Sequence, residues 1–304
     1  MPVEVKRWKK VWDKCPWSTA FSSPLWQGVV EAIEPRNETY EWEGIFTPLS
    51  KISLAKGFLQ GFESSVPGVP AGPVSEREPS DTLVNDYWND LNRRTSGRFL
   101  VHMRPDSPFT NTTFKMISTP GYVLNLKDRD KKLRSHHRRL VKKAREAGIT
   151  VSKARRESDI DAYFDMYEAS VKRWRKKSSR VYPKSFFDDI HRYLIGTDAA
   201  SLFLAYKNEK PQAGALILYE PDRAVYWHGS TISNPEPGSA QLLHVEIMNT
   251  AANNGVTLYD FGPSAGLQGV ERFKQGFGAG IENMVTVLGP AKAFTSYFLR
   301  RKRR

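Results

Sequence analysis

Short apolar strands alternate with amphipathic helices through the second half of this chain, and that order constrains the fold more than any other feature. Between residues 149 and 288 the pattern predicts a strand, two helices, three strands, a helix, a strand, a glycine-rich loop with a helix, and a last strand. In the helix expected at 239–253, Leu243, Ile247 and Ala251 repeat at helical spacing. Strands and helices mixed around a sheet indicate an α/β (α+β) fold and argue against a β-sandwich or a helix bundle.

In the first half of the chain the periodic patterns of helices and strands are weaker, because prolines and glycines interrupt them. Residues 66–79 combine three prolines with two glycines in the stretch 67–73, so we expect a loop there. The other elements expected before residue 120 are a helix at 24–33, a strand hairpin at 42–54, a helix at 81–94 capped by Ser80 or Asp81, and strands at 99–103 and 114–117.

A strongly basic helix is expected at 128–147, where Gly148 follows in a favourable C-cap position. The 304 residues suffice for about two domains, and we place the junction near this helix. The expected domains are 1–140 and 141–304, and the tail 290–304 could pack back on the first domain. No apolar stretch is long enough to cross a bilayer and no signal peptide opens the chain, so we expect a cytoplasmic protein, with peripheral contact at the inner membrane face left open.

The formal net charge of +13 favours an anionic partner, such as nucleic acid, a nucleotide or an anionic membrane surface. A basic enzyme with dispersed lysines is the alternative. The single cysteine, Cys15, excludes a disulfide within the chain and a Cys-x-x-Cys metal site, and it suits a reducing compartment. The six histidines are isolated or adjacent on a helix, so we expect no metal site.

Five segments carry a resemblance to a known family. They are the basic helix with its Ala-Gly end at 138–149, Tyr-Pro-Lys-Ser-Phe-Phe at 182–187, the strand hairpin at 204–215, Tyr-Trp-His-Gly-Ser at 226–230, and Tyr-Asp-Phe-Gly at 259–262 followed by Phe-Lys-Gln-Gly-Phe-Gly at 273–278. In this order and spacing they resemble the Fem-type (FemA/FemB/FemX-like) aminoacyltransferases, a branch of the GNAT superfamily. The resemblance covers about residues 124–288, and residues 21–26 are the main matching piece before it.

The resemblance implies two GNAT-like domains packed side by side, with mixed central sheets flanked by helices and a substrate cleft between the domains. It implies transfer of an acyl group to an amine, as better-known members do when they move an amino acid from aminoacyl-tRNA to a peptidoglycan precursor. The expected partners are tRNA, an amine-bearing peptide or envelope precursor, and an anionic membrane surface in peripheral contact. No cofactor is expected, because the acyl donor is a co-substrate. Acyl-CoA is the alternative donor, and a non-enzymatic RNA- or membrane-binding protein is the second alternative.

Lys274, Asp260 and Tyr259 are the candidate catalytic residues. In the resemblance the lysine faces the active cleft and meets phosphate or a developing oxyanion, where positive charge stabilises the transition state. A lysine facing solvent on a short helix is the other interpretation. Asp260 could accept a proton or orient the amine, or it could bind backbone N–H groups in the turn at 262–263.

Tyr226, His228, Phe273 and Trp26 are the candidate substrate-binding residues. Tyr226 and His228 alternate on one expected strand, so both should point to the same face. Plain packing of aromatic rings in a sheet is the alternative for Tyr226. In the cell-wall members, as the resemblance implies, a lysine after the early tryptophan grips the diphosphate, whereas Gln27 follows Trp26 here, which argues against a peptidoglycan precursor.

A further set of residues is a candidate for phosphate or RNA binding: Arg138, Arg139, Lys142, Lys143, Gly276 and Gly278. The cations could contact tRNA phosphates, and Trp174, in the second basic segment, could stack on a base. Gly276 and Gly278 would allow the backbone to approach phosphate closely. A solvated helix face is the ordinary explanation for such a run of charge.

Overall fold

The computed structural model describes residues 4–31, 33, 38–54, 59–66, 68–174, 181–292 and 294–296, without the side chains of Leu54 and Trp174. The chain divides into two compact units, one made of Met1–Pro120 and Asn283–Arg304 and the other of Gly121–Glu282. These boundaries differ from the expected division at 140 and 141, which falls inside a helix. Phe294, from the tail expected to return to the first domain, packs in the first unit against Leu100 and Leu288.

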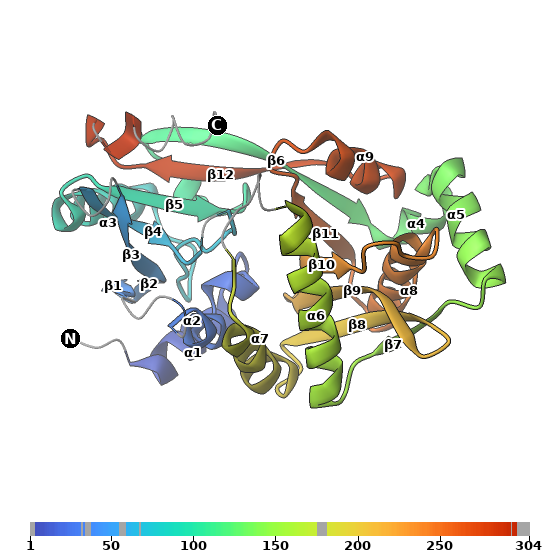
Figure 1. Cartoon of the computed structure of the whole chain (residues 1–304). Helices are drawn as coiled ribbons and strands as arrows, with labels where there is room; N and C mark the ends of the chain where they lie inside the picture. The colour runs from blue at the N-terminus through green and yellow to red at the C-terminus, as the bar shows by residue number, and fades with distance from the viewer. Residues whose placement is uncertain are drawn as a thin grey trace. The chain divides into compact units, whose positions relative to one another are not determined.

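The first unit combines short strands with three longer helices (Figure 1). Its helices and helical turns are α1 (Val5–Lys14), η1 (Ala20–Ser22), α2 (Pro24–Glu31), α3 (Asp81–Thr95) and η3 (Pro108–Thr110). Its strands are β1 (Tyr40–Trp42), β2 (Ile45–Thr47), β3 (Leu49–Leu54), β4 (Leu59–Ser64) and β5 (Phe99–Met103), joined by the second part of β12 (Gly280–Leu288). The strands β1 and β2 form a hairpin, and the order of the larger set is β3-β4-β5-β12.

An aromatic core holds the first unit together. On α3, Tyr87, Trp88 and Leu91 are buried as their helical spacing predicts, and Val84 is buried in place of Leu83, which is only half-buried. Two elements were not predicted. Helix α1 buries Trp8 and Val11 at i, i+3 although lysines surround them, and β4 pairs with β3 over six residues.

The second unit holds most of the predicted elements. Its strands are the end of β6 (Lys115–Asn125), β7 (Thr150–Lys153), β8 (Ala200–Lys207), β9 (Lys210–Tyr219), β10 (Arg223–Thr231), β11 (Leu258–Pro263) and the start of β12. Its helices and helical turns are η4 (Leu126–Asp128), α4 (Arg129–Lys132), α5 (Ser135–Glu146), α6 (Glu157–Trp174), α7 (Lys184–Ile190), η5 (His191–Ile195), α8 (Ser239–Asn253) and α9 (Gln268–Gly276). The expected mixed α/β class is confirmed.

The strand order in this unit is β6-β11-β10-β9-β8-β7, in which only the β10–β11 pair is parallel. Leu242, Leu243 and Ile247 of α8 pack with apolar side chains of this sheet in one core cluster. On β9, Gly214 lies instead against Tyr163 of α6, so α6 covers the opposite face.

The basic helix predicted at 128–147 is in fact two helices, α4 and α5, which are separated at Leu133 and Arg134. The backbone N–H of Arg134 donates to the Gly276 carbonyl, 3.0 Å away at the end of α9, rather than continuing the helix. This tertiary contact explains a break that helix propensity alone does not predict. In the described part of the chain, every helix is too short or too polar to cross a membrane.

Candidate functional site

The two parallel strands of the second unit part after a short common stretch. Strand β10 pairs with β11 at Arg223–Leu258, Ala224–Tyr259 and Val225–Asp260, and the pairing ends there. Beyond that point β10 stays paired with β9, while β11 loses its regular register with β6 between Asp260 and Pro263. Ligands of open α/β sheets commonly bind outside the carboxyl ends of parallel strands. The candidate site therefore lies among the residues at this point of divergence.

A bulge in β10 corrects the expectation that Tyr226 and His228 share a face. Tyr226 lies opposite Ile217 and His228 lies opposite Leu216, so Trp227 is an extra residue in the strand. The Tyr226 ring contacts His244 of α8 at a centroid distance of 4.5 Å. His228 instead packs against Tyr163 and Tyr167 of α6, on the opposite face. One extra residue reverses the side-chain alternation, so the two side chains cannot line one pocket wall.

Lys274 of α9 is buried beneath the turn that ends β11, with only 3% of its surface exposed. Its Nζ donates to three successive backbone carbonyls, those of Phe261 at 2.6 Å, Gly262 at 2.9 Å and Pro263 at 2.9 Å. An ammonium has three N–H donors, so this geometry uses all of them. Lys274 does not face solvent, and it fixes the path of the main chain where the parallel strands part.

Asp260 also holds this turn. Its Oδ1 accepts a hydrogen bond from the Gly262 N–H at 2.7 Å, which is the turn-binding role considered beside the catalytic one. Its Oδ2 lies 3.7 Å from Nη1 of Arg223, and the same nitrogen donates to Oε1 of Glu282 at 2.5 Å. Burial raises the pKa of Asp260 above its ordinary value, while the Gly262 N–H and Arg223 oppose that rise.

Tyr259, the third candidate catalytic residue, is fully buried in the core of the unit. Its hydroxyl forms a 2.8 Å hydrogen bond with Nδ1 of His244. Burial lowers the pKa of His244 to about 3, with Lys274 and His137 adding to the effect, so this imidazole is neutral at physiological pH. The Tyr259–His244 hydrogen bond is buried beneath the parting strands. The His244 ring also contacts the rings of Phe261 and Tyr226.

Gly276 and Gly278 are packed against protein. A Cβ added at Gly276 would lie 2.2 Å from Cε1 of His137, and one at Gly278 would lie 2.3 Å from Cβ of Lys132. Gly278 also has a φ of +84°, which favours glycine. His137 in turn bonds through Nε2 to the Phe273 carbonyl at 3.0 Å. The two glycines therefore let α4 and α5 approach α9 closely.

The remaining candidates divide between the two units. Phe273 is half-buried and its ring lies 5.4 Å from that of His244, so it belongs with the core beneath the site. Trp26 is in the first unit, where it is fully buried and its Nε1 donates to Oγ of Ser65 at 2.8 Å. The substrate-binding role of both residues stays a prediction.

The exposed face of α5 carries the predicted basic set, Arg138, Arg139, Lys142 and Lys143. Val141 and Ala144 bury the opposite side of the helix. Among the described residues, Glu146 is the acidic partner of this set: it lies 3.8 Å from Lys142, and both side chains are well exposed. Exposed pairs of this kind contribute little, so the face keeps its positive charge. Residues 175–180, the basic loop also considered for RNA, lie outside the described residues.

Residues 131–275 match the family described as acetyltransferase (GNAT) domain. This segment is therefore similar to GNAT domains. It falls within the second unit and contains the parting strands β10 and β11 with the lysine that holds their turn. The resemblance expected from the sequence is confirmed at this level. No curated protein matches the chain in sequence.

Solved structures extend the likeness to the whole chain, at the level of the fold. The structure of FemX is 12% identical with a TM-score of 0.71, covering 97% of this chain and 98% of its own. The C-terminal domain (DUF2156) of a protein designated a lysylphosphatidylglycerol synthetase from Agrobacterium fabrum is 14% identical with a TM-score of 0.68, covering 97% and 94%. L-PGS from Bacillus licheniformis is 8% identical with a TM-score of 0.64, covering 93% and 96%.

Sequence reasoning missed three residues of the candidate site: Arg223, Glu282 and His244. Arg223 and Glu282 are far apart in sequence, and nothing local pairs them. The bulge had a visible signal, because Gly229 interrupts a strand and a glycine there commonly marks a bulge. Within the described residues, no three His, Cys, Asp or Glu side chains gather in a way that could hold a metal ion.

The pKa of Lys274 makes a prediction about stability. Burial lowers this pKa to about 8 from its ordinary 10.5, and the charge of Asp260 opposes the shift. Between these two values the unfolded chain binds the proton and the folded chain releases it, so stability should rise with pH. Relative to Lys274→Met, the wild-type free energy of unfolding should increase by up to about 1 kcal/mol per pH unit above pH 8. Urea unfolding of both proteins at several pH values between 7 and 10 measures this difference in free energy. A difference that does not change with pH would contradict the lowered pKa of Lys274.

Proposed function

We propose that the protein is an N-acyltransferase of the Fem type, which moves an aminoacyl group from aminoacyl-tRNA to the amine of a peptide or cell-envelope precursor. The observation that carries the proposal is the parting of β10 and β11 within the segment similar to GNAT domains, at a turn held by Lys274. The strand divergence leaves main-chain groups beyond Val225 and Asp260 outside the β10–β11 ladder, where they can bind an acyl carbonyl. Amide formation from an ester needs a positioned carbonyl and a neutral amine, and it needs no metal.

The exposed basic face of α5 supports a tRNA donor. Four cations at positions i, i+1, i+4 and i+5 share one side of a helix and can follow a phosphate backbone. FemX, the domain of the protein designated a lysylphosphatidylglycerol synthetase, and L-PGS share the fold of the whole chain, which supports aminoacyl transfer over other acyl transfers. A peptidoglycan precursor is one candidate acceptor, although Gln27 beside Trp26 argues against a diphosphate grip there.

Acyl-CoA is the alternative donor, and the GNAT match favours it. To bind the pyrophosphate of CoA, a domain can use the free backbone N–H groups at the N-terminus of a helix, which must then be accessible. Here Gly238, which precedes α8, faces the Leu140 carbonyl so closely that an added Cβ would lie 2.1 Å from its oxygen. Helix α5 therefore already covers the start of α8, which supports tRNA over CoA.

The decisive experiment offers purified protein either charged tRNA pools or radiolabelled acetyl-CoA, together with a panel of amines. Acyl transfer from charged tRNA is the expected result. Transfer from acetyl-CoA alone would replace the proposal with the CoA-dependent reaction. Absence of transfer from either donor, with salt-sensitive RNA binding retained, would indicate a non-enzymatic RNA-binding protein.

The basic face makes a prediction of its own. Replacing Arg138, Arg139, Lys142 and Lys143 by glutamine should weaken tRNA binding and reduce the slope of log K against log salt by about 3, because each phosphate contact contributes roughly 0.7–0.9. Replacing the same number of exposed lysines on α1, namely Lys6, Lys9, Lys10 and Lys14, is the matched control. Equal salt slopes for both variants would remove α5 from the RNA interface.

A further inference from the structure

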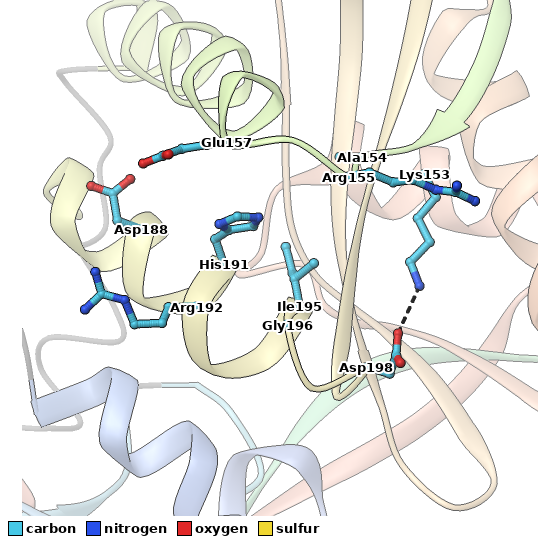
Figure 2. A pocket seen from close by; sticks show the side chains of 10 residues that line it. All are labelled: Lys153, Ala154, Arg155, Glu157, Asp188, His191, Arg192, Ile195, Gly196 and Asp198. Carbon is cyan, nitrogen blue, oxygen red and sulfur yellow. Dashed lines mark hydrogen bonds and ion pairs between the residues drawn. The ribbon is translucent and has the colours of Figure 1, made fainter.

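A pocket of about 610 Å³ opens in the second unit, away from the parting strands (Figure 2). The end of β7, the start of α6, the end of α7, the turn η5 and the residues before β8 supply its walls. Its lining residues are Lys153, Ala154, Arg155, Glu157, Asp188, His191, Arg192, Ile195, Gly196 and Asp198. None of these residues belongs to the candidate transfer site. The volume lies in the range of small-molecule sites.

One wall of this pocket is a π-helical turn. The chain continues from α7 into η5, where the Gly196 N–H donates to the His191 carbonyl five residues earlier, at 3.0 Å. A Cβ at Gly196 would lie 2.9 Å from the Arg192 carbonyl oxygen, so a larger residue would strain this turn. The turn brings His191, Arg192 and Ile195 to the same pocket. Such turns are rare in proteins and occur frequently at functional sites.

The charged side chains of the lining are balanced in sign. The cations are Lys153, Arg155 and Arg192, and the carboxylates are Glu157, Asp188 and Asp198. Figure 2 shows Glu157, Asp188 and Arg192 on one side of the pocket, Lys153, Arg155 and Asp198 on the other, and His191 between them. A lining that presents both signs suits a ligand that carries both charges, and it disfavours a polyanion.

Ion pairs within the protein account for some of these charges. Lys153 lies 3.4 Å from Asp198, and Asp188 lies 2.8 Å from Lys184, which is outside the lining. Among the residues that the structure describes, Glu157, Arg155 and Arg192 have no ion-pair partner. One unpaired carboxylate and two unpaired guanidiniums thus remain in the lining, and Glu157 and Arg155 lie on opposite sides of the pocket.

The start of α6 is already capped. Oδ2 of Asp159 accepts hydrogen bonds from the N–H groups of Arg155 and Arg156, both at 3.0 Å. A carboxylate in this position satisfies backbone donors that would otherwise attract a phosphate. Recognition in the pocket therefore falls to the side chains.

We propose that this pocket binds a zwitterionic ligand of the α-amino acid or short-peptide class, with its ammonium at Glu157 and its carboxylate at Arg155. The opposed charges fix the direction of the ligand, and Ile195 gives its side chains apolar contact. The site lies at the beginning of α6, a helix of 18 residues, which spans about 27 Å at 1.5 Å per residue. It is a second binding site in this unit, and it does not depend on the proposed transfer reaction.

The test is calorimetric titration of the full chain with L-alanyl-L-alanine. N-acetyl-L-alanyl-L-alanine lacks the ammonium, and L-alanyl-L-alaninamide lacks the carboxylate. The free dipeptide should bind at least tenfold more tightly than either blocked form. In Glu157→Gln the preference over the acetylated peptide should disappear, and in Arg155→Gln the preference over the amide should disappear. Glu209→Gln, which changes an exposed carboxylate in the β8–β9 turn, should bind as the wild type does.

Three outcomes would overturn the proposal. The first is equal binding of the three peptides, and the second is no saturable binding of the free dipeptide up to about 10 mM, beyond which an affinity is too weak to be specific. The third is tight binding of inorganic phosphate with no dipeptide binding, which would assign the pocket to an anion. Circular dichroism of each variant confirms that it is folded. Because the readout is binding alone, its result is independent of any result on acyl transfer.

Discussion

Replacing Lys274 by methionine is expected to lower acyl transfer at least tenfold and to destabilise the protein. Methionine keeps the length and the apolar stem of the side chain but removes all three N–H donors. The carbonyls of Phe261, Gly262 and Pro263 would lose their partner, and each buried acceptor left unpaired costs about 1 kcal/mol or more. We expect a loss of about 3 kcal/mol in the free energy of unfolding, together with a displaced end of β11.

Kinetics at a temperature well below unfolding separates the two effects. Lys274 touches backbone, so we assign it a positioning role, and the loss should fall mainly on kcat, because the acyl carbonyl would be held in the wrong place. Lys210→Met, at the exposed start of β9, is the matched control and should change neither property. Normal turnover by folded Lys274→Met would remove the turn from the mechanism.

Replacing Gly276 by alanine should be the most damaging single-methyl change in α9. The added Cβ would lie 2.2 Å from the His137 ring, which is buried and cannot move freely because its Nε2 bonds to Phe273. Overpacking of this kind costs about 1–3 kcal/mol, and we expect the upper end. The measurement is the free energy of unfolding in urea.

Gly269 supplies a matched control in the same helix. No atom lies within 4 Å of a Cβ added there, so Gly269→Ala should be neutral or stabilise by up to about 1 kcal/mol through helix propensity. A Gly276→Ala variant as stable as Gly269→Ala, but defective in binding the acyl donor, would restore the phosphate-binding interpretation.

The elements of the second unit could be predicted well because their periodicity is local. The helix expected at 239–253 coincides with α8, and the last strand expected before residue 288 corresponds to β12. Their apolar spacing and terminal glycines are properties of the sequence alone. Helix α1 was not predicted, because six charged residues surround Trp8 and Val11 and obscure their i, i+3 spacing.

The candidate site was less predictable, because its geometry depends on contacts between distant segments. The bulge at Trp227 reverses the face of His228, and no alternation pattern reports one extra residue. Lys274 and Asp260, which the sequence suggested as catalytic residues, lie at one turn, and their partners are backbone groups and Arg223, which the motif does not specify. The catalytic roles of Lys274, Asp260 and Tyr259 stay predictions.

Strands β6 and β12 each begin in one unit and end in the other. A truncated protein made of residues 131–275, the limits of the family match, would lack the β6 residues that pair with Leu258–Asp260. It would also lack Glu282, and Arg223 would then be buried without its nearest carboxylate. Truncation would therefore damage the turn at the end of β11. The function of this turn should be tested by point substitutions in the intact chain.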